Sequence, residues 1–229
     1  MQTDMTVGKP MKMLLNFTIP VFLGNVFQQL YSMADAVIVG KFVGTKGLAA
    51  VGATGTITFL IIGFLMGLTT GFTVLTSQKF GAGRMDEMRK TVGNAAILSV
   101  VIAVVMTAVS MLGMHRLLVF MHTPEDIFDG AYGYIKIICA GIFTQVLYNL
   151  VSSILRALGN SKTPLYFLIL AAVLNIVLDL VFIIFFHWGA PGAAWATVIS
   201  QGVSGLLCLV YIWKAVPELR MKREDWHFN

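Results

Sequence analysis

Two aspartates, Asp35 and Asp179, lie inside long apolar stretches of the chain, where a carboxylate is costly. No charged residue occurs between Met13 and Ala34, and Asp35 follows directly. An aspartate near the middle of a membrane helix costs roughly 2.5–3.5 kcal/mol on insertion scales. Uncharged polar residues join membrane helices at a lower cost, so both aspartates predict a functional site rather than simple helix packing.

A shared depth connects these aspartates with Asn175 and Thr197. Asn175 and Asp179 are spaced i, i+4, so their side chains lie one above the other on a helix. At about 1.5 Å per residue, Asp35, Asp179 and Thr197 lie roughly 6–10 Å outward of the midpoints of their predicted spans. Their oxygens suit a small cation such as Na⁺, whereas two nearby carboxylates at low dielectric can hold one proton between them. We expect a site for H⁺ or Na⁺, and the accompanying amide and hydroxyl favour one that can hold Na⁺. Its residues are Asp35, Asn175, Asp179 and Thr197.

Further polar side chains recur at helical spacing on one face of the first span and again in the fourth. Hydrogen bonding between packed helices is one explanation for them, and a polar cavity is the other. Pro20, in the first span, should bend that helix because proline removes an intrahelical hydrogen bond. We expect the polar residues to line a substrate cavity: Asn25, Gln28, Tyr31, Gln145 and Asn149.

The elements that must position these residues are membrane helices. The chain of 229 residues is 57% hydrophobic and only 12% charged, and its mean hydropathy is +0.82. Soluble domains contain about 25% charged residues, so this composition indicates an integral membrane protein. Because about 20 apolar residues cross a bilayer, the sequence predicts an all-α fold with six transmembrane helices. The segments are about 14–40, 48–77, 92–114, 132–155, 164–187 and 193–213.

The basic residues predict the orientation of these helices. Of the 16 Lys and Arg, only Lys41, Lys46, Arg116 and Lys136 fall on the side away from the termini. The rest, including Arg156 at the end of the fourth span, fall on the side of the termini. Because basic loops stay in the cytoplasm, both termini should be cytoplasmic in a multi-pass protein of the cell (inner) membrane. Topology thus explains the net charge of +5, and we expect no nucleic-acid partner.

The chain divides into a cytoplasmic amino terminus at 1–12, a six-helix transmembrane region at 13–214 and a polar cytoplasmic tail at 215–229. No G-x-x-x-x-G-K-[ST] phosphate-binding motif occurs, so the sequence predicts no ATPase. We expect no cofactor besides the H⁺ or Na⁺ of the cation site.

Two blocks of the sequence resemble the multidrug and toxic compound extrusion (MATE) transporters. They are QQLYSMADAVIVGKFVGTKGLAAVG at 28–52 and the stretch from GNSKTPLYFLILAAVLNIVLDLVFI to GAPGAAWATVISQ at 159–201. The resemblance implies a secondary active transporter and not an enzyme, one that exports drug-like, often cationic compounds by alternating access. It also implies that the family's ion-coupling residues in its amino-terminal lobe fall on Asp35, Asn175, Asp179 and Thr197, with Tyr31 beside them and the bending proline at Pro20.

Members of that family have twelve spans in two lobes, and the six predicted here correspond to one lobe, with the tail resembling the inter-lobe linker. The resemblance therefore implies a fragment, a truncated product, or a half-transporter that needs a second lobe or a second copy as its partner. Two alternatives are a flippase for lipid-linked saccharides of the same superfamily and a non-transporting membrane subunit. The flippase would need several basic residues in its cavity, and only Arg156 approaches that role.

Overall fold

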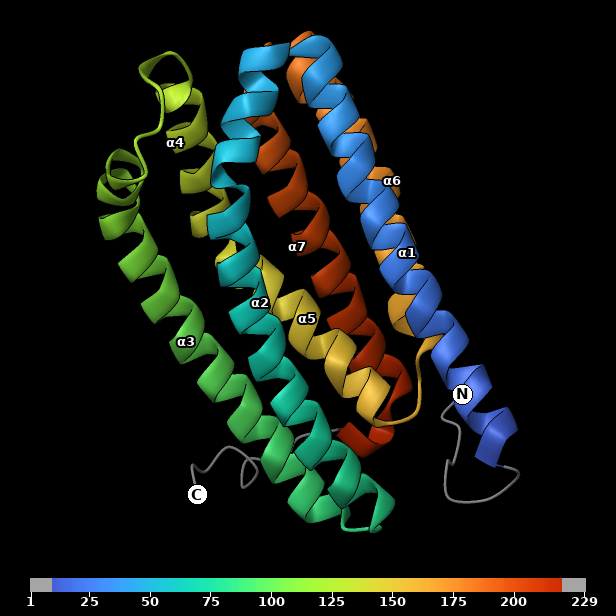
Figure 1. The fold of residues 1–229 in the computed structure, drawn as a ribbon. Coiled ribbons are helices and arrows are strands. Elements are labelled where there is room, and N and C mark those ends of the chain that lie inside the picture. The colour runs from blue at the N-terminus through green and yellow to red at the C-terminus, as the bar shows by residue number, and fades with distance from the viewer. Residues whose placement is uncertain (1–9, 220–229) are drawn as a thin grey trace.

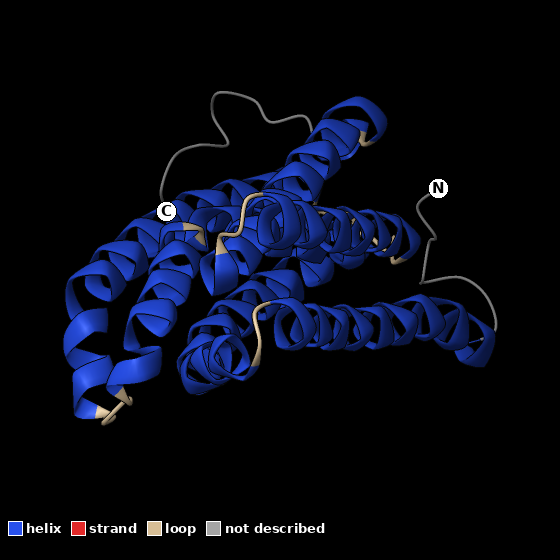
Figure 2. Cartoon of the chain, turned by 90° about the horizontal axis from the view of Figure 1, so that it is seen from above, coloured by secondary structure: helices blue, strands red, loops and turns tan. Residues whose placement is uncertain are grey.

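The computed structural model describes residues 10–219, and the regular secondary structure of this part of the chain is all helical (Figure 1). Seen from above, the helices are joined by short loops (Figure 2). The elements are α1 (Pro10–Phe42), α2 (Thr45–Gly81), α3 (Met85–Phe120), α4 (Glu125–Ala140), α5 (Ile142–Ala157), α6 (Lys162–Leu180), η1 (Val181–Phe185), α7 (Gly189–Ala215) and η2 (Pro217–Leu219).

Five of these helical segments are long and apolar enough to cross a membrane, and α4 with α5 makes a sixth span. The predicted all-α fold with six spans is confirmed. Large apolar side chains point outward, as Leu112 does with 83% of its surface exposed. In a membrane protein, lipid chains replace the water that would otherwise meet such side chains.

The fourth span is not one straight helix, because α4 and α5 meet at Gly141 with a bend of 47°. A Cβ at Gly141 would lie only 2.2 Å from Cγ2 of Val198 on α7. Glycine therefore lets α7 pack directly against the bend. The Gly141 carbonyl accepts from the backbone N–H of Gln145 at 3.3 Å and also from the hydroxyl of Thr144 at 2.8 Å.

The first and last long helices have their outer ends on the same side of the bundle, as an even number of spans requires. α1 begins and α7 ends at the same end of the bundle (Figure 1). The predicted tail does not leave the bundle at once, because η2 folds back and Leu219 is buried beside Met88 and Val216. The rest of that tail, and residues 1–9, lie outside the described residues.

The first helix packs mainly along α6 and has little contact with α2, although α2 follows it in the chain. In Figure 1 the two helices diverge from their shared loop and leave α7 visible between them. This packing decides where polar residues of α1 can meet those of α6 and α7. It also decides where a cleft can form.

Candidate functional site

The two aspartates meet between α1 and α6. Asp35 is 9% exposed and Asp179 is fully buried. Their carboxyl groups lie close enough to interact electrostatically. Two ionised carboxylates this close would repel one another, so a proton or another cation between them would stabilise the pair.

Thr197 on α7 brings a third helix to the pair. Its Oγ1 accepts a hydrogen bond from the Tyr31 hydroxyl at 3.1 Å. The same oxygen accepts a second bond from Nδ2 of Asn175 at 3.4 Å. Both lone pairs of the threonine oxygen are thereby engaged. The bond to Nδ2 also leaves the amide oxygen of Asn175 available for another partner.

Four oxygens at this site have no hydrogen-bond donor among the residues that the structure describes. They are Oδ1 of Asp35, Oδ1 of Asn175, and both carboxyl oxygens of Asp179. Buried acceptors without a donor are rare in folded proteins and call for a bound ion, a proton or water. A set of hard oxygen atoms fits Na⁺ as well as H⁺.

The four residues predicted for cation binding are thus brought together, from α1, α6 and α7. Thr197 differs from the other three, because its oxygen is occupied by Tyr31 and Asn175 and serves to position them. Directly after Asp179, α6 widens into the π-helical turn η1. Single π-helical turns inside helices often accompany functional sites.

Tyr134 on α4 is a neighbour of the site that the sequence did not single out. Its side chain is 8% exposed and lies close enough to interact electrostatically with Asp35, Tyr31 and Asp179. The signal in the sequence was a polar hydroxyl near the start of the fourth span. Tyrosine is common near membrane interfaces, so that signal is not specific for a functional site.

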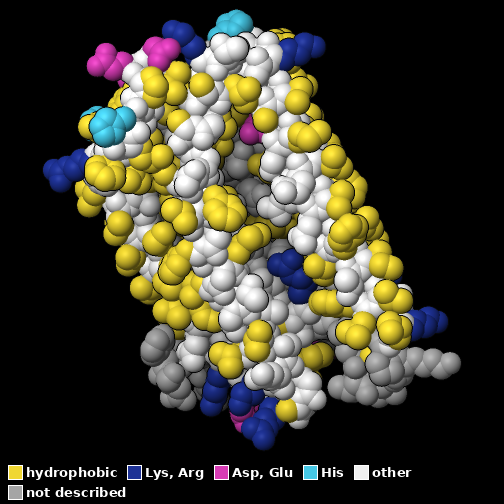
Figure 3. All heavy atoms as spheres, viewed as in Figure 1, with side chains coloured by type: hydrophobic (Ala, Val, Ile, Leu, Met, Phe, Trp, Pro, Cys, Tyr) yellow, Lys and Arg dark blue, Asp and Glu magenta, His cyan; other side chains and the backbone are white. Residues whose placement is uncertain are grey.

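A cleft of about 590 Å³ opens between α1 and α2, next to this site. Figure 3 shows the hollow on this face, with an acidic side chain visible inside it and hydrophobic side chains on both flanks. Asn25 and Gln28, both predicted to face substrate, line the cleft together with Tyr134.

A second, small pocket of about 50 Å³ adjoins the cleft and shares Asn25 and Gln28 with it. Asn149 and Pro20 line this pocket, and α1 continues through Pro20 without a break. The remaining two residues of the predicted cavity lie elsewhere. Tyr31 belongs to the cation site, and Gln145 is partly buried on α5 and lines neither pocket.

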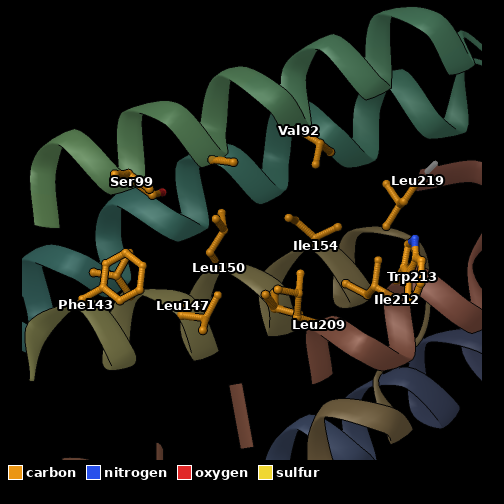
Figure 4. Close-up of a pocket in the computed structure, with 14 residues that line it drawn as sticks. Val92, Ser99, Phe143, Leu147, Leu150, Ile154, Leu209, Ile212, Trp213 and Leu219 are labelled. Carbon is orange, nitrogen blue, oxygen red and sulfur yellow. The ribbon is translucent and has the colours of Figure 1, made fainter. Parts of the chain in front are cut away.

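The largest groove described lies apart from this chemistry. It measures about 750 Å³ and runs between α3, α5 and α7, lined by side chains such as Phe143, Leu150 and Trp213 (Figure 4). Ser99 is the one polar side chain among its lining residues, and none is charged. Such a groove suits lipid chains rather than ion coupling.

Comparison with known proteins gives consistent results. The sequence profile of the family described as MatE matches residues 20–181. The chain is 35% identical over 211 residues to the probable multidrug resistance protein YpnP of Bacillus subtilis, covering 92% of this chain and 47% of that protein.

Solved structures extend the likeness to the fold. A MOP superfamily transporter from Pyrococcus furiosus superposes with a TM-score of 0.90 and 28% identity, over 97% of this chain and 49% of that one. A MATE crystal structure in complex with Br-NRF superposes with a TM-score of 0.81 and 28% identity, over 95% of this chain and 51% of that one. The chain spans about half the length of the relatives that it matches.

Proposed function

The chain belongs to the MatE family of membrane transporters, and we propose that it acts as the amino-terminal lobe of a cation-coupled multidrug exporter. In this proposal H⁺ or Na⁺ enters the site between α1 and α6 while a drug-like, often cationic compound leaves through the cleft. The protein is a multi-pass membrane protein and not an enzyme.

The buried carboxyl pair carries the proposal. Asp35 and Asp179 face one another from two helices, and three of their four oxygens have no donor among the described residues. The two carboxylates cannot be ionised at the same time at low dielectric without a counter-ion, because like charges in a buried site repel one another. A site built in this way takes up a cation and releases it, as an ion-coupled transporter requires.

Packing around α1 supports a link between the ion and the cleft. A bound cation removes the repulsion between Asp35 and Asp179 and holds α1 against α6. Release of the cation leaves two like charges facing one another and favours movement of α1 away from α6. Because α1 has little contact with α2, that movement would change the width of the cleft between them.

The second half of the transport pathway comes from a partner in this proposal. The chain spans about half of its relatives, and the cleft opens on one face of the bundle (Figure 3). A second lobe or a second copy of this chain would cover that face. The ion site needs no such partner, because all of its described residues come from one chain.

Substitution of Asp179 tests the function. Cells that express the chain together with the partner that completes the pathway, a second copy or a second lobe, should export ethidium. Asp179→Asn should abolish that export while membrane insertion and protein level stay unchanged. Asp126→Asn is the matched control, because Asp126 is an exposed carboxylate paired with Lys46 at the bundle surface. Export by the Asp179→Asn variant at the rate of the unaltered chain would overturn the coupling role.

A further inference from the structure

Buried polar side chains continue along α7 from the cation site toward the end of that helix. Gln201 and Ser204 follow Thr197 at spacings of four and three residues, so the three side chains share one face of α7. Gln201 is 5% exposed and Ser204 is fully buried. At 1.5 Å per residue, Ser204 lies about 10 Å from the level of Thr197. The direction is toward the end of the bundle where α1 begins (Figure 1).

This face of α7 is covered by α5 and α6, along both of which α7 packs. Thr197 accepts a hydrogen bond from Asn175 of α6. A Cβ at Gly205, the residue after Ser204, would lie 3.2 Å from the backbone nitrogen of Tyr148 on α5. The polar side chains thus lie inside the bundle and apart from the α1–α2 cleft, which no residue of α7 lines.

Three of these side chains have no hydrogen-bond partner for their oxygen among the residues that the structure describes. They are Gln201 at Oε1, Ser204 at Oγ and Ser152 of α5 at Oγ, and they are called the inner polar row. Serines in helices often donate to a backbone carbonyl of the preceding turn. Ser200 does so, donating to the Thr197 carbonyl at 3.0 Å. The two serines of the inner polar row do not, so their hydroxyls are available to another partner.

Water is the ligand that fits these oxygens. A buried water makes about three hydrogen bonds to polar groups that the protein leaves unpaired. Steps of three and four residues separate neighbouring groups by about 4.5–6 Å along the helix axis, a distance that one bridging water can span. Ala171 is buried one turn before Asn175, near the level of Gln201, and its small side chain leaves room there. A metal ion would need carboxylates, and the inner polar row has none.

The inner polar row ends beside titratable groups near the small pocket. Tyr148 lies close to Ser152 and to Cys208, which follows Ser204 by four residues. Tyr148 also lies close to Arg156. Both Tyr148 and Arg156 line the pocket of about 50 Å³, together with residues of the first turn of α6. The pocket therefore lies at the opposite end of the inner polar row from the carboxyl pair.

We propose that the inner polar row binds a file of water molecules that carries protons between the carboxyl pair and the small pocket. A proton leaving the pair is accepted by the first water, which passes one of its own protons onward, so each water keeps two. The Gln201 amide orients these waters, and each serine hydroxyl accepts one proton as it releases another. The inference rests on the proposed function, because it gives H⁺ a route between the same cation site and one end of the bundle.

The bound waters can be detected by radiolytic hydroxyl labelling with mass spectrometry, because radicals form from water in place and oxidise the nearest side chains. Cys208 and Cys139 are both fully buried. Cys208 should be oxidised because it adjoins the inner polar row. Cys139 should not, because it packs in an apolar cluster. Ser204→Ala removes one oxygen and should lower the labelling of Cys208 severalfold.

The proton route is tested by time-resolved infrared spectroscopy of the purified chain in nanodiscs, which follows the carboxyl band after a jump in pH. Ser204→Ala and Gln201→Leu should each slow protonation of the pair about tenfold, the effect of losing one hydrogen bond from the path. The pH at half-protonation should stay unchanged. Ser200→Ala is the matched control and should leave the rate unchanged, because that hydroxyl is bonded to its own helix.

Equal labelling of the two cysteines, or no labelling of Cys208, would overturn the inference. An unchanged protonation rate in both variants would do the same, because any waters present would then be structural only. A shift of the half-protonation pH without a change in rate would also assign these residues a purely structural role.

The proposed function fails separately. If the variants slow protonation while the chain and its partner export no ethidium, the export proposal is wrong and this inference stands. If export depends on Asp179 while protonation ignores the inner polar row, the reverse holds.

Discussion

Tyr31 donates its phenolic hydroxyl to Oγ1 of Thr197 across 3.1 Å, although the two residues are 166 positions apart in the chain. The bond joins the first helix to the last at the level of the carboxyl pair. Asn175 donates to the same oxygen from α6. One hydroxyl oxygen therefore positions groups from two other helices around the cation site.

Removal of this acceptor should weaken cation binding. Thr197→Val keeps the shape of the side chain but leaves Tyr31 and the Asn175 amide without their acceptor. If the site holds Na⁺, the affinity for ²²Na⁺ at alkaline pH should fall about tenfold, because two hydrogen bonds of roughly 0.5–1.5 kcal/mol each are lost. Tyr31→Phe removes one of the two bonds and should have a smaller effect.

The outcomes of this measurement separate the two ions. Equilibrium dialysis of the purified chain gives the affinity directly. No saturable ²²Na⁺ binding by the unaltered chain would leave H⁺ as the coupling ion. Saturable binding that Thr197→Val does not change would show that the threonine is not needed to hold Asn175 in place.

Hydropathy was sufficient to predict the helical spans, and helical spacing was sufficient to predict that Asp35, Asn175, Asp179 and Thr197 share a layer. The bend at Gly141 could not be predicted, because it depends on the close approach of Val198 from α7. A sequence gives the depth of a residue within one helix. It does not give the face that a neighbouring helix will cover.

Arg156 illustrates that limit. Its position at the end of a span made it one of the basic residues that predict orientation. In the structure its side chain lines a pocket beside the cleft. Gln145 shows the opposite case, since its spacing predicts a cavity residue and its side chain lines neither pocket. The spacing of polar residues along α5 was not sufficient to predict that Arg156 lines a pocket and Gln145 does not.

Enlargement of Gly141 should destabilise the bundle. In Gly141→Ala the new Cβ would lie 2.2 Å from Val198 Cγ2, so α5 or α7 must shift. Overpacking of this kind costs about 1–3 kcal/mol, and the melting temperature in detergent should fall. Gly113→Ala is the control, because no atom lies within 4 Å of its added Cβ. The double variant Gly141→Ala, Val198→Ala should recover much of the loss, and an unchanged melting temperature in the single variant would contradict this account of the bend.

The orientation of the termini can be tested with single cysteines. Both native cysteines, Cys139 and Cys208, are fully buried and should give little background. If the basic loops are cytoplasmic, an impermeant maleimide should label Lys46→Cys in intact cells. The same reagent should label Arg84→Cys only after the membrane is opened. Labelling in the reverse pattern would place the termini outside.

The cleft face should be covered by a partner that is not lipid. Asn25, Gln29 and Ser32 are exposed on α1 and line the cleft, and hydrocarbon chains offer them no hydrogen bonds.

If the chain acts unaided, two copies should face each other across this cleft. Cysteines replacing Phe42 or Leu48, at the joined ends of α1 and α2, should then form oxidative crosslinks in native membranes. A cysteine replacing Leu112, which is 83% exposed on α3, should not, because it lies on a different helix from the cleft. Crosslinks at Leu112 of equal yield would mean random collision. A monomeric band for the Phe42 and Leu48 variants at every expression level would exclude the homodimer and require a separate second lobe.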